Sequence, residues 1–246
     1  RKKINDFEIY KDQLKQRLDP TVTIRQGINS FIKKNQKKIV FADGEDENTL
    51  KAAIAFKNSK LGIPILVGKE SKIKEQIRNI GYNENFDIEI INSKDEEKRK
   101  KYLKHLFEKL QREQGLLERD CDRLLRNDRV IWATSMVACG DADGAVTGNT
   151  RRFGASLEKI KQVVDVREGE IMFGLNMVVH KGKTIFIGDT SVHEYPTSEE
   201  LAEIAISTAR VVRLFGFEPK VAFVSHSTFG QPLTSRTKHI RNAVEI

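Results

Sequence analysis

The chain has little cysteine and no long apolar run, and each shortage excludes a class of protein. Cys121 and Cys139 are the only cysteines among 246 residues, too few for a disulfide framework or a four-ligand zinc site. They predict reduced thiols in a cytoplasmic protein. No stretch of about 18 apolar residues occurs, which excludes a membrane span. The charged first residues are followed by no apolar segment, so they are not a signal peptide.

The formal net charge of +8 is unevenly distributed. Residues 1–36 hold nine Lys and Arg against four Asp and Glu. The other basic run, Lys94–Arg129, is interleaved with acids, which is typical of a solvated helix face. No RNP-type or other nucleic-acid motif is present. The charge therefore fits small anionic ligands, and a nucleic-acid-binding function would rest on net charge alone.

Hydrophobic periodicity predicts helices in residues 1–36, and then strands that alternate with helices of 10–15 residues up to about residue 164. This alternation is typical of crossover units, so it predicts an α/β fold with a parallel sheet and helices on both faces. A further helical stretch is expected over residues 116–140. The charge density falls after about residue 130, which predicts two lobes with a boundary near residues 148–154.

The later part of the chain has a different pattern. Two apolar runs around Lys181 and Gly182 predict a β-hairpin. The sequence Thr197-Ser198-Glu199-Glu200 predicts a capping box, in which the threonine hydroxyl and Glu200 satisfy each other's backbone donors at a helix start. Val221–Val224 predicts a buried strand.

Two stretches carry candidate binding residues. In CGDADGAVTGNTRRFG, residues 139–154, a short strand is followed by Thr147, Asn149 and Arg151. Open α/β sheets bind ligands at the carboxyl ends of their strands, so Arg151 could face an anion there. A strand with a turn at each end explains the pattern too. Asp141 and Asp143 could bind a cation, but two carboxylates are too few for a dedicated calcium site.

SHSTFG, Ser225–Gly230, follows the predicted strand and precedes a basic helix. Hydroxyls and free backbone N–H groups at such a junction form a nest for anions. An ordinary turn between strand and helix explains the same residues equally well. We interpret His226 as a structural hydrogen-bonding group rather than a catalytic base.

Four stretches, in order, are similar to the phosphate acetyl/butyryltransferase family: KKIVFADGEDENTLKAA, GDADGAVTGNTRRF, GKTIFIGDTSVHEYPTSEELAEIAISTARVVRLFGFEPKVA and SHSTFG. Within it, nearly the whole chain resembles the phosphotransacetylase-like C-terminal module of bacterial NADP-dependent malic enzymes. The resemblance implies a three-layer α/β/α fold with two lobes, like isocitrate/isopropylmalate dehydrogenase, incomplete at the C-terminus. It also implies a helical connector from an upstream malic enzyme region (1–36), a first lobe (37–150) and a truncated second lobe (151–246).

The resemblance further implies that acetyl-CoA or CoA and an acyl phosphate meet between the lobes, where the CoA thiolate attacks acetyl phosphate directly. SHSTFG matches the family's phosphate-holding Ser-x-Ser-Thr loop. Arg112 falls roughly where the family has a functional arginine, although its Arg-Glu-Gln-Gly sequence is one residue shorter than the active form. The candidate ligand-binding residues are therefore Ser225, Ser227, Thr228, Gly230, Arg112, Thr147, Asn149 and Arg151.

Active relatives also carry an Asp-Leu-Ser-Arg-Gly motif, with the transition-state arginine and, nearby, the aspartate base. This sequence has no such motif, so the resemblance implies a fragment without catalytic residues. We expect a regulatory and assembly module of a homo-oligomeric malic enzyme, with NADP and the divalent metal bound upstream of these residues. The alternatives are part of a working phosphate acetyltransferase and a basic nucleic-acid-binding protein.

Overall fold

The chain divides into two compact units, which we call the sheet unit (29–165) and the hairpin unit (166–246, with the described residues of 1–28). A computed structural model describes residues 10–11, 14, 28–29, 31–82, 87–92, 95–180, 183–228 and 231–246. Gly230, the expected hairpin turn at Lys181 and Gly182, and most of the expected connector lie outside the described residues.

The sheet unit contains four parallel strands in the order β3-β2-β1-β4 among its described residues. The parallel sheet expected from the alternating pattern is therefore confirmed. The strands are β1 (Lys38–Phe41), β2 (Ile63–Val67), β3 (Glu89–Ile91) and β4 (Gly144–Val146).

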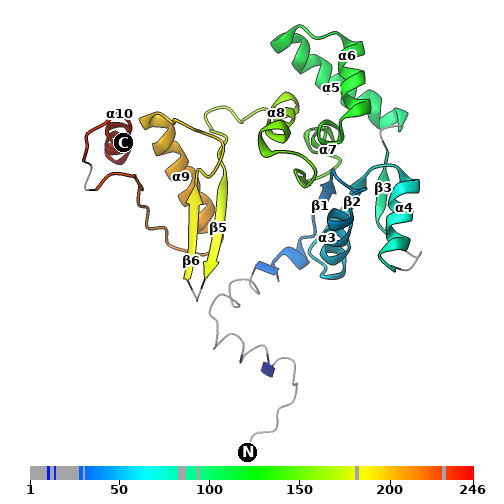
Figure 1. The fold of residues 1–246 in the computed structure, drawn as a ribbon, viewed down its shortest axis with the longest axis horizontal. Helices are drawn as coiled ribbons and strands as arrows, with labels where there is room; N and C mark the ends of the chain where they lie inside the picture. The colour runs from blue at the N-terminus through cyan, green and yellow to red at the C-terminus, as the bar shows by residue number, and fades with distance from the viewer. Residues whose placement is uncertain are drawn as a thin grey trace, which may run out of the picture. The chain divides into compact units, whose positions relative to one another are not determined.

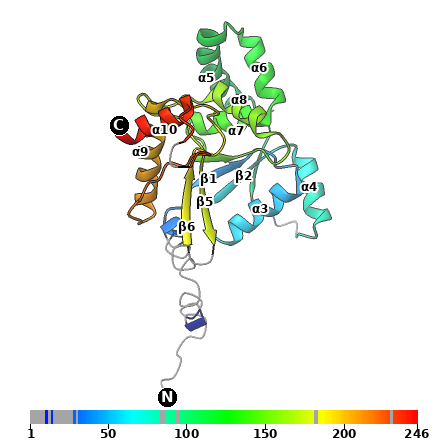
Figure 2. The ribbon, with the colours of Figure 1, turned by 60° about the vertical axis from the view of Figure 1, so that its left-hand side comes forward.

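Helices cover both faces of this sheet, and α5 and α6 extend beyond it side by side (Figures 1 and 2). Successive strand residues alternate between the two faces. Ile65 and Val67 pack in one apolar cluster with residues of α5, α6 and α7, whereas Leu66 packs in the other with residues of α3 and α4. The helices are α3 (Glu47–Asn58), α4 (Glu70–Asn79), α5 (Glu96–Gln114), α6 (Glu118–Asn127), α7 (Arg129–Ala138) and α8 (Phe153–Val163).

The helical stretch expected over residues 116–140 is divided into α6 and α7 at Asp128. The backbone of Asp128 is extended, with φ −122° and ψ 112°, and its carboxylate accepts from the backbone N–H groups of Val130 and Ile131. A short polar side chain that satisfies the free donors at a helix start favours a new helix over a continuous one. Asp128 is therefore the N-cap of α7.

Two side chains of α5 hold the carboxyl end of α8. Lys109 Nζ donates to Lys161 O at 2.9 Å and to Asp165 Oδ1 at 2.5 Å, and His105 Nε2 contacts Val163 O at 3.0 Å. These groups satisfy carbonyls that the helix itself leaves without a partner. The sheet unit accordingly runs to residue 165, beyond the lobe boundary expected at residue 150. The assignment of lobes stays a prediction.

The hairpin unit is built on β5 (Leu175–His180) and β6 (Lys183–Gly188), which pair antiparallel as expected. α9 (Ser198–Leu214) begins with the predicted capping box, because Thr197 and Glu200 each accept from the other's backbone N–H. The ring of Phe186 lies 5.4 Å from Phe215 at the end of α9. The last helix is α10 (Ser235–Glu245).

The prediction of a buried strand at Val221–Val224 is wrong. These residues pair with no strand in the described part of the chain, and Val224 is 88% exposed. Four apolar residues with β-branching have strand propensity, but a strand also needs a neighbour that supplies hydrogen bonds. The segment therefore joins no sheet among the described residues, and it leads into residues 225–228, which we call the serine loop.

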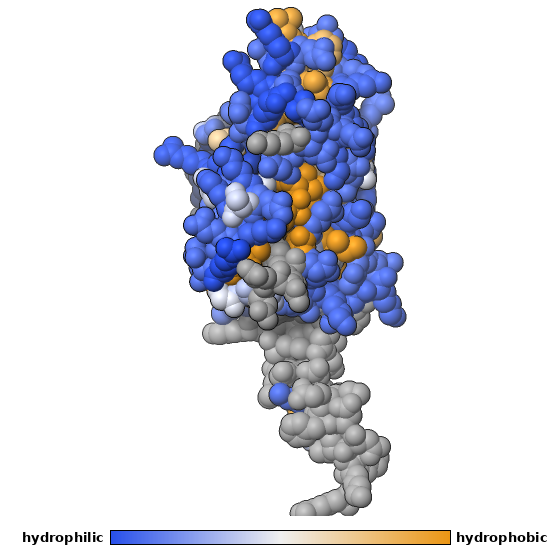
Figure 3. Space-filling view, turned by 90° about the vertical axis from the view of Figure 1, so that its right-hand side faces the viewer, coloured by the Kyte–Doolittle hydropathy of each residue, from blue (hydrophilic) through white to orange (hydrophobic). Residues whose placement is uncertain are grey.

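Figure 3 shows the face of the sheet unit that carries α4, α5 and α6, which is mostly hydrophilic with a narrow apolar strip along its middle. This matches the prediction that the basic run with interleaved acids forms solvated helix faces. None of the helices in the described part of the chain is both long and apolar enough to cross a bilayer.

Candidate functional site

The strand order of the sheet unit places a topological switch point at the carboxyl ends of β1 and β4. From β1 the chain proceeds to β2 and β3 on one side, and then returns to place β4 on the other side. Open α/β sheets bind ligands outside such a point, because the loops after the two central strands diverge there. The loops concerned are Ala42–Asp46 and Thr147–Arg152, and the second holds three of the predicted binding residues.

The two loops are joined by hydrogen bonds between side chains. Thr150 Oγ1 donates to Asp43 Oδ1 at 2.6 Å, and Asn149 Nδ2 donates to Asp46 Oδ1 at 2.5 Å. Asp46 is also the N-cap of α3, where it accepts from Thr49 N at 2.9 Å. This backbone hydrogen bond lowers the pKa of Asp46 more than burial raises it, so the carboxylate stays ionised. These contacts hold Asn149, one of the predicted binding residues, beside the loop that follows β1.

Arg151 is paired with a carboxylate of its own unit. Its Nη1 lies 2.7 Å from Asp128 Oδ2, at the start of α7. Thr147 is oriented differently, since its buried hydroxyl has no hydrogen-bond partner among the described residues and lines a cavity of about 210 Å³ between α7, α8 and β4. Because Arg151 is already paired with Asp128, it could bind an anion only by sharing its charge with that carboxylate.

Arg112 lies in the last turn of α5, and its Nε donates to Glu108 O at 2.8 Å within the same helix. Gly115 ends this helix with φ +66°, in the left-handed region, which glycine enters without steric cost. Nothing in the described contacts joins Arg112 to the residues after β4. The geometry therefore provides no support of its own for a shared site.

Asp141 and Asp143 are engaged in structural contacts. Asp141 accepts from Tyr102 Oη and from Lys101 Nζ, each at 2.7 Å. Asp143 accepts from Lys37 Nζ at 3.0 Å and from Lys38 N at 2.8 Å. The pKa of Tyr102 is raised mainly by burial and further by the hydrogen bond to Asp141. The phenol therefore stays protonated and can donate. Among the described residues, no group of three or more His, Cys, Asp or Glu could hold a metal ion.

The serine loop lies in the hairpin unit. Ser225 Oγ and Ser227 Oγ are 3.1 Å apart, and Ser227 N donates to Ser225 Oγ at 3.3 Å. Thr228 pairs with Gln231 across the residues that follow. The hydroxyls of Ser225 and Ser227 are thus hydrogen-bonded to each other, and either of them can be the donor. The structure brings these three predicted residues together in one turn.

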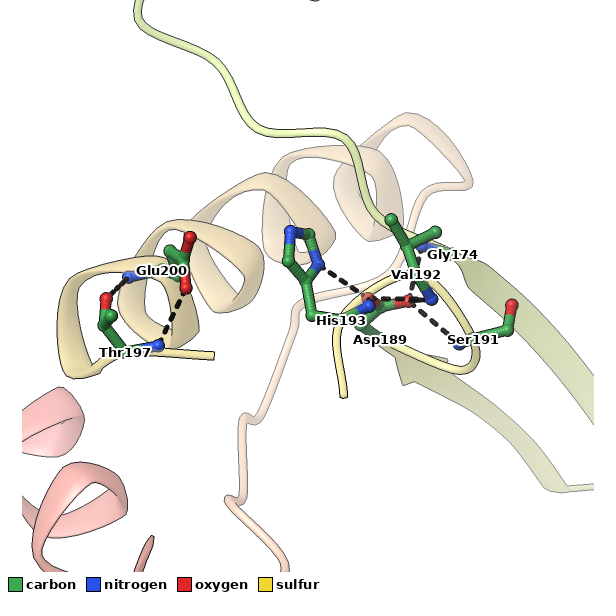
Figure 4. Close-up of polar contacts among 7 residues, drawn as sticks. All are labelled: Gly174, Asp189, Ser191, Val192, His193, Thr197 and Glu200. Atoms are coloured by element: carbon green, nitrogen blue, oxygen red, sulfur yellow. Dashed lines mark hydrogen bonds and ion pairs between the residues drawn. The ribbon is translucent and has the colours of Figure 1, made fainter. Parts of the chain in front are cut away.

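A second polar cluster of the hairpin unit was not singled out in the sequence. Figure 4 shows Asp189, directly after β6, with its carboxylate enclosed by the following turn. It accepts from Gly174 N at 2.7 Å, from Ser191 N at 3.1 Å and from His193 N at 2.8 Å, and its Oδ2 lies 2.8 Å from His193 Nδ1. Burial alone would raise the pKa of Asp189, but these hydrogen bonds together lower it to about 2.

Asp189 therefore holds the loop between β6 and α9 as an acceptor that is ionised at neutral pH. The sequence contained a signal for this contact in Gly188-Asp189-Thr190-Ser191-Val192-His193. There an aspartate follows an apolar run and precedes small polar residues. An aspartate in such a position commonly accepts from the backbone N–H groups of the next residues.

Several known proteins are similar to this chain in sequence. The model of the phosphate acetyl/butaryl transferase family matches residues 23–246, so the chain belongs to that family. The NADP-dependent malic enzyme of Rhizobium meliloti is 39% identical over 100% of this chain, which spans about a third, 32%, of that relative's length. The phosphate acetyltransferase of Clostridium acetobutylicum is 33% identical over 87% of this chain and 66% of its own length.

A solved structure shows the same fold. The crystal structure of a phosphotransacetylase from Streptococcus pyogenes has a TM-score of 0.80 to this chain at 27% sequence identity. The match covers 91% of this chain and 68% of the other. The mixed α/β fold with a parallel sheet is therefore that of phosphotransacetylases, as the resemblance implied.

Proposed function

We propose that this chain is the phosphotransacetylase-like module of a cytoplasmic NADP-dependent malic enzyme, in which it binds acetyl-CoA or an acyl phosphate. Binding would regulate malate oxidation, and the module would also support assembly of a homo-oligomer. The observation that carries the proposal is the match to malic enzymes over the whole chain, at 39% identity in one relative. NADP and a divalent metal would bind to other residues of such an enzyme.

The residues proposed to bind ligand lie in both units, in the serine loop, after β4 and in α5. The resemblance also implies a two-lobed fold like that of isocitrate dehydrogenase. The serine hydroxyls, 3.1 Å apart, suit a phosphate oxygen, because hydroxyls can rotate to donate to a common acceptor. The residues proposed to bind ligand are Ser225, Ser227, Thr228, Gly230, Arg112, Thr147, Asn149 and Arg151.

The thiols are consistent with a reducing compartment. Cys121 is buried and Cys139 partly buried, and neither forms a disulfide. Burial raises the pKa of both thiols, which keeps them protonated and slow to oxidise.

A second candidate function is acyl transfer itself, in which CoA and acetyl phosphate give acetyl-CoA and phosphate. The relative named phosphate acetyltransferase, 33% identical to this chain, favours it. The two functions share the serine loop, and they differ in whether ligand binding is followed by turnover.

One experiment separates the two functions. In the complete protein in which this chain occurs, malate-dependent NADP reduction is measured with and without acetyl-CoA, and acetyl-CoA formation from acetyl phosphate and CoA is measured in parallel. Malate oxidation that responds to acetyl-CoA, without acyl transfer, supports the regulatory function. Clear acyl transfer supports the second, and the absence of both responses overturns both.

The serine loop is tested by Ser227→Ala, with Ser71→Ala on the exposed face of α4 as the matched control. Loss of a hydroxyl that donates to a phosphate should weaken the acetyl-CoA or acyl-phosphate response about tenfold. Ser71→Ala should leave it unchanged. Equal effects of the two substitutions would show that the loop does not contact the ligand.

A further inference from the structure

One face of α9 carries a stripe of side chains that points to solvent. The helix contacts β6 and α10 with other residues buried along its length. The stripe residues follow one another at steps of four, three, four and three, which places them on one side of a helix. Four of them are exposed and Glu203 is half-buried. The stripe consists of Glu199, Glu203, Ile206, Arg210 and Arg213.

The charges of this stripe are ordered along the helix. Two acids lie in the first half, two arginines lie in the second half, and Ile206 lies between them. Glu199 and Arg213 are each seven residues from Ile206, and Glu203 and Arg210 are three and four residues from it. The stripe is therefore nearly symmetric in position about Ile206 and opposite in charge.

The helix dipole explains only part of this order. Acids near the start of a helix and bases near its end complement the dipole, but this effect is confined to the first and last turns. It accounts for Glu199 and Arg213. It does not account for Glu203 and Arg210 in the interior of α9, or for Ile206, which is 51% exposed. An apolar centre with charges around it is the usual arrangement of a contact surface.

The charged groups of the stripe are only weakly engaged within the described chain. Arg210 lies 3.6 Å from Glu170, and both side chains are largely open to solvent, so this pair is easily shared. Glu203 accepts from the hydroxyl of Ser207 at 2.9 Å, which leaves its charge uncompensated. Arg213 forms no ion pair with any described residue. These charges are therefore available to a partner.

From these features we infer that α9 pairs antiparallel with α9 of a second copy of this chain, about a two-fold axis at Ile206. Glu199 of one copy would then face Arg213 of the other, and Glu203 would face Arg210. A two-fold axis repeats each contact in both directions, so four ion pairs would surround the two Ile206 side chains. The inference rests on the assembly role in the proposed function and names the surface that serves it.

The pairing of one helix face buries less area than a standard interface, so the dimer should be weak. We expect a dissociation constant of about 10–100 µM. The preference for a second copy comes from the order of the charges, because complementary charges favour the correct partner and orientation more than they add affinity.

Sedimentation velocity of the 246-residue chain from about 1 to 500 µM tests the inference. Arg213→Glu would bring like charges together twice in the dimer and should weaken it at least about tenfold, as should Glu199→Arg. The variant with both substitutions regains complementary charges and should return to within about threefold of the parent. Lys104→Glu, on the exposed face of α5, makes the same change in net charge as Arg213→Glu and should leave the dimer unchanged.

Ile206→Cys provides a second readout, because a residue on the two-fold axis meets its own counterpart. Mild oxidation should link this variant into covalent dimers, and Lys104→Cys should not form them. Circular dichroism establishes that each variant is folded. A dimer that none of the α9 substitutions changes would overturn the inference and leave assembly to another surface. A chain that stays monomeric at about 500 µM would overturn it as well, whereas the response to acetyl-CoA is tested separately.

Discussion

The sheet unit and the hairpin unit contain the same kinds of apolar residue but bury them to different extents. Ile65 and Leu66 of β2 are at most 1% exposed, whereas Ile185 and Ile187 of β6 are 57% and 46% exposed. In the sheet unit, helices cover both faces of a parallel sheet. In the hairpin unit, α9 packs on β6, and the face that carries Ile185 and Ile187 is open. A parallel sheet is stable only when both its faces are covered, whereas a two-stranded hairpin contributes little core of its own.

The difference shows that local pattern and burial are separate properties of a sequence. The strand pattern is as strong in β6 as in β2, but only β2 lies between two layers of helices. In the hairpin unit, polar contacts of Asp189 and of the Thr197 capping box fix the loop before α9. The effects of substitutions on stability should therefore differ between the two units, both in size and in physical cause.

The largest effect is expected at the centre of the sheet unit. Leu106 in α5 is fully buried, and Leu106→Ala leaves a cavity that the neighbouring helices fill only in part. The free energy of unfolding of the sheet unit should fall by about 2–5 kcal/mol. Urea unfolding followed by Trp132 fluorescence measures it, because Trp132 lies in the same apolar cluster. A loss below about 1 kcal/mol would contradict a close-packed core.

A smaller effect is expected from Asp189→Asn in the hairpin unit. The carboxylate, 5% exposed, has a pKa of about 2 against an ordinary 3.8, so its ionised form stabilises the fold above about pH 4. Allowing for partial screening by solvent, this contribution is about 1–2 kcal/mol. It is lost as the pH falls from 4 to 2, because protonation is then favoured in the folded state too.

Hydrogen exchange of the amides of Gly174, Ser191 and His193 measures this change. Their protection should fall in the variant at pH 7, and the difference from the parent should shrink towards pH 2. The Trp132 unfolding midpoint should stay constant. If that midpoint shifts as well, the two units unfold together and the comparison between them has to be revised.

Thr197→Ala should have a moderate effect, confined to the start of α9. It removes the hydroxyl that accepts from Glu200 N at 3.2 Å, and the loss of an N-cap typically costs about 1 kcal/mol. Thr197→Ser keeps the acceptor and serves as the matched control. Thermal unfolding measured by circular dichroism distinguishes the two variants. Equal losses of stability in both would show that the methyl group of Thr197 matters rather than its hydroxyl cap.

The smallest effect is expected at Ile185. A substitution to threonine keeps β-branching and removes apolar surface that is already 57% exposed, so stability should change by less than about 0.5 kcal/mol. Urea unfolding followed by circular dichroism measures it. A larger loss would mean that this face of the hairpin is covered in solution, which would remove the contrast with the sheet unit.

The order of strands and helices could be predicted from the sequence because it depends on local spacing. Apolar runs such as Ile63–Val67 are bounded by glycine and polar residues, and the parallel pairing follows from the helices between them. The capping box at Thr197 is also a local signal. The break at Asp128 was missed, although an aspartate before an apolar helix is a capping residue.

The errors and omissions concern contacts between residues far apart in the chain. Val221–Val224 has the composition of a strand, but no described strand lies beside it. Arg151 was predicted to face an anion from its place after β4, and nothing local shows its ion pair with Asp128. For the same reason the pairing of Asp141 with Tyr102 could not be predicted. The candidate site residues themselves stay predictions, which the binding experiments will test.

The contacts that α5 makes with the end of α8 have a mechanical consequence. Lys109 holds Lys161 and Asp165, immediately before the chain passes into the hairpin unit at Val166. A pulling force applied from residue 166 onwards would therefore load this lysine and the long helix that carries it before it reached any strand. Lys109 therefore anchors the end of the sheet unit to α5, and the parallel sheet does not carry this force.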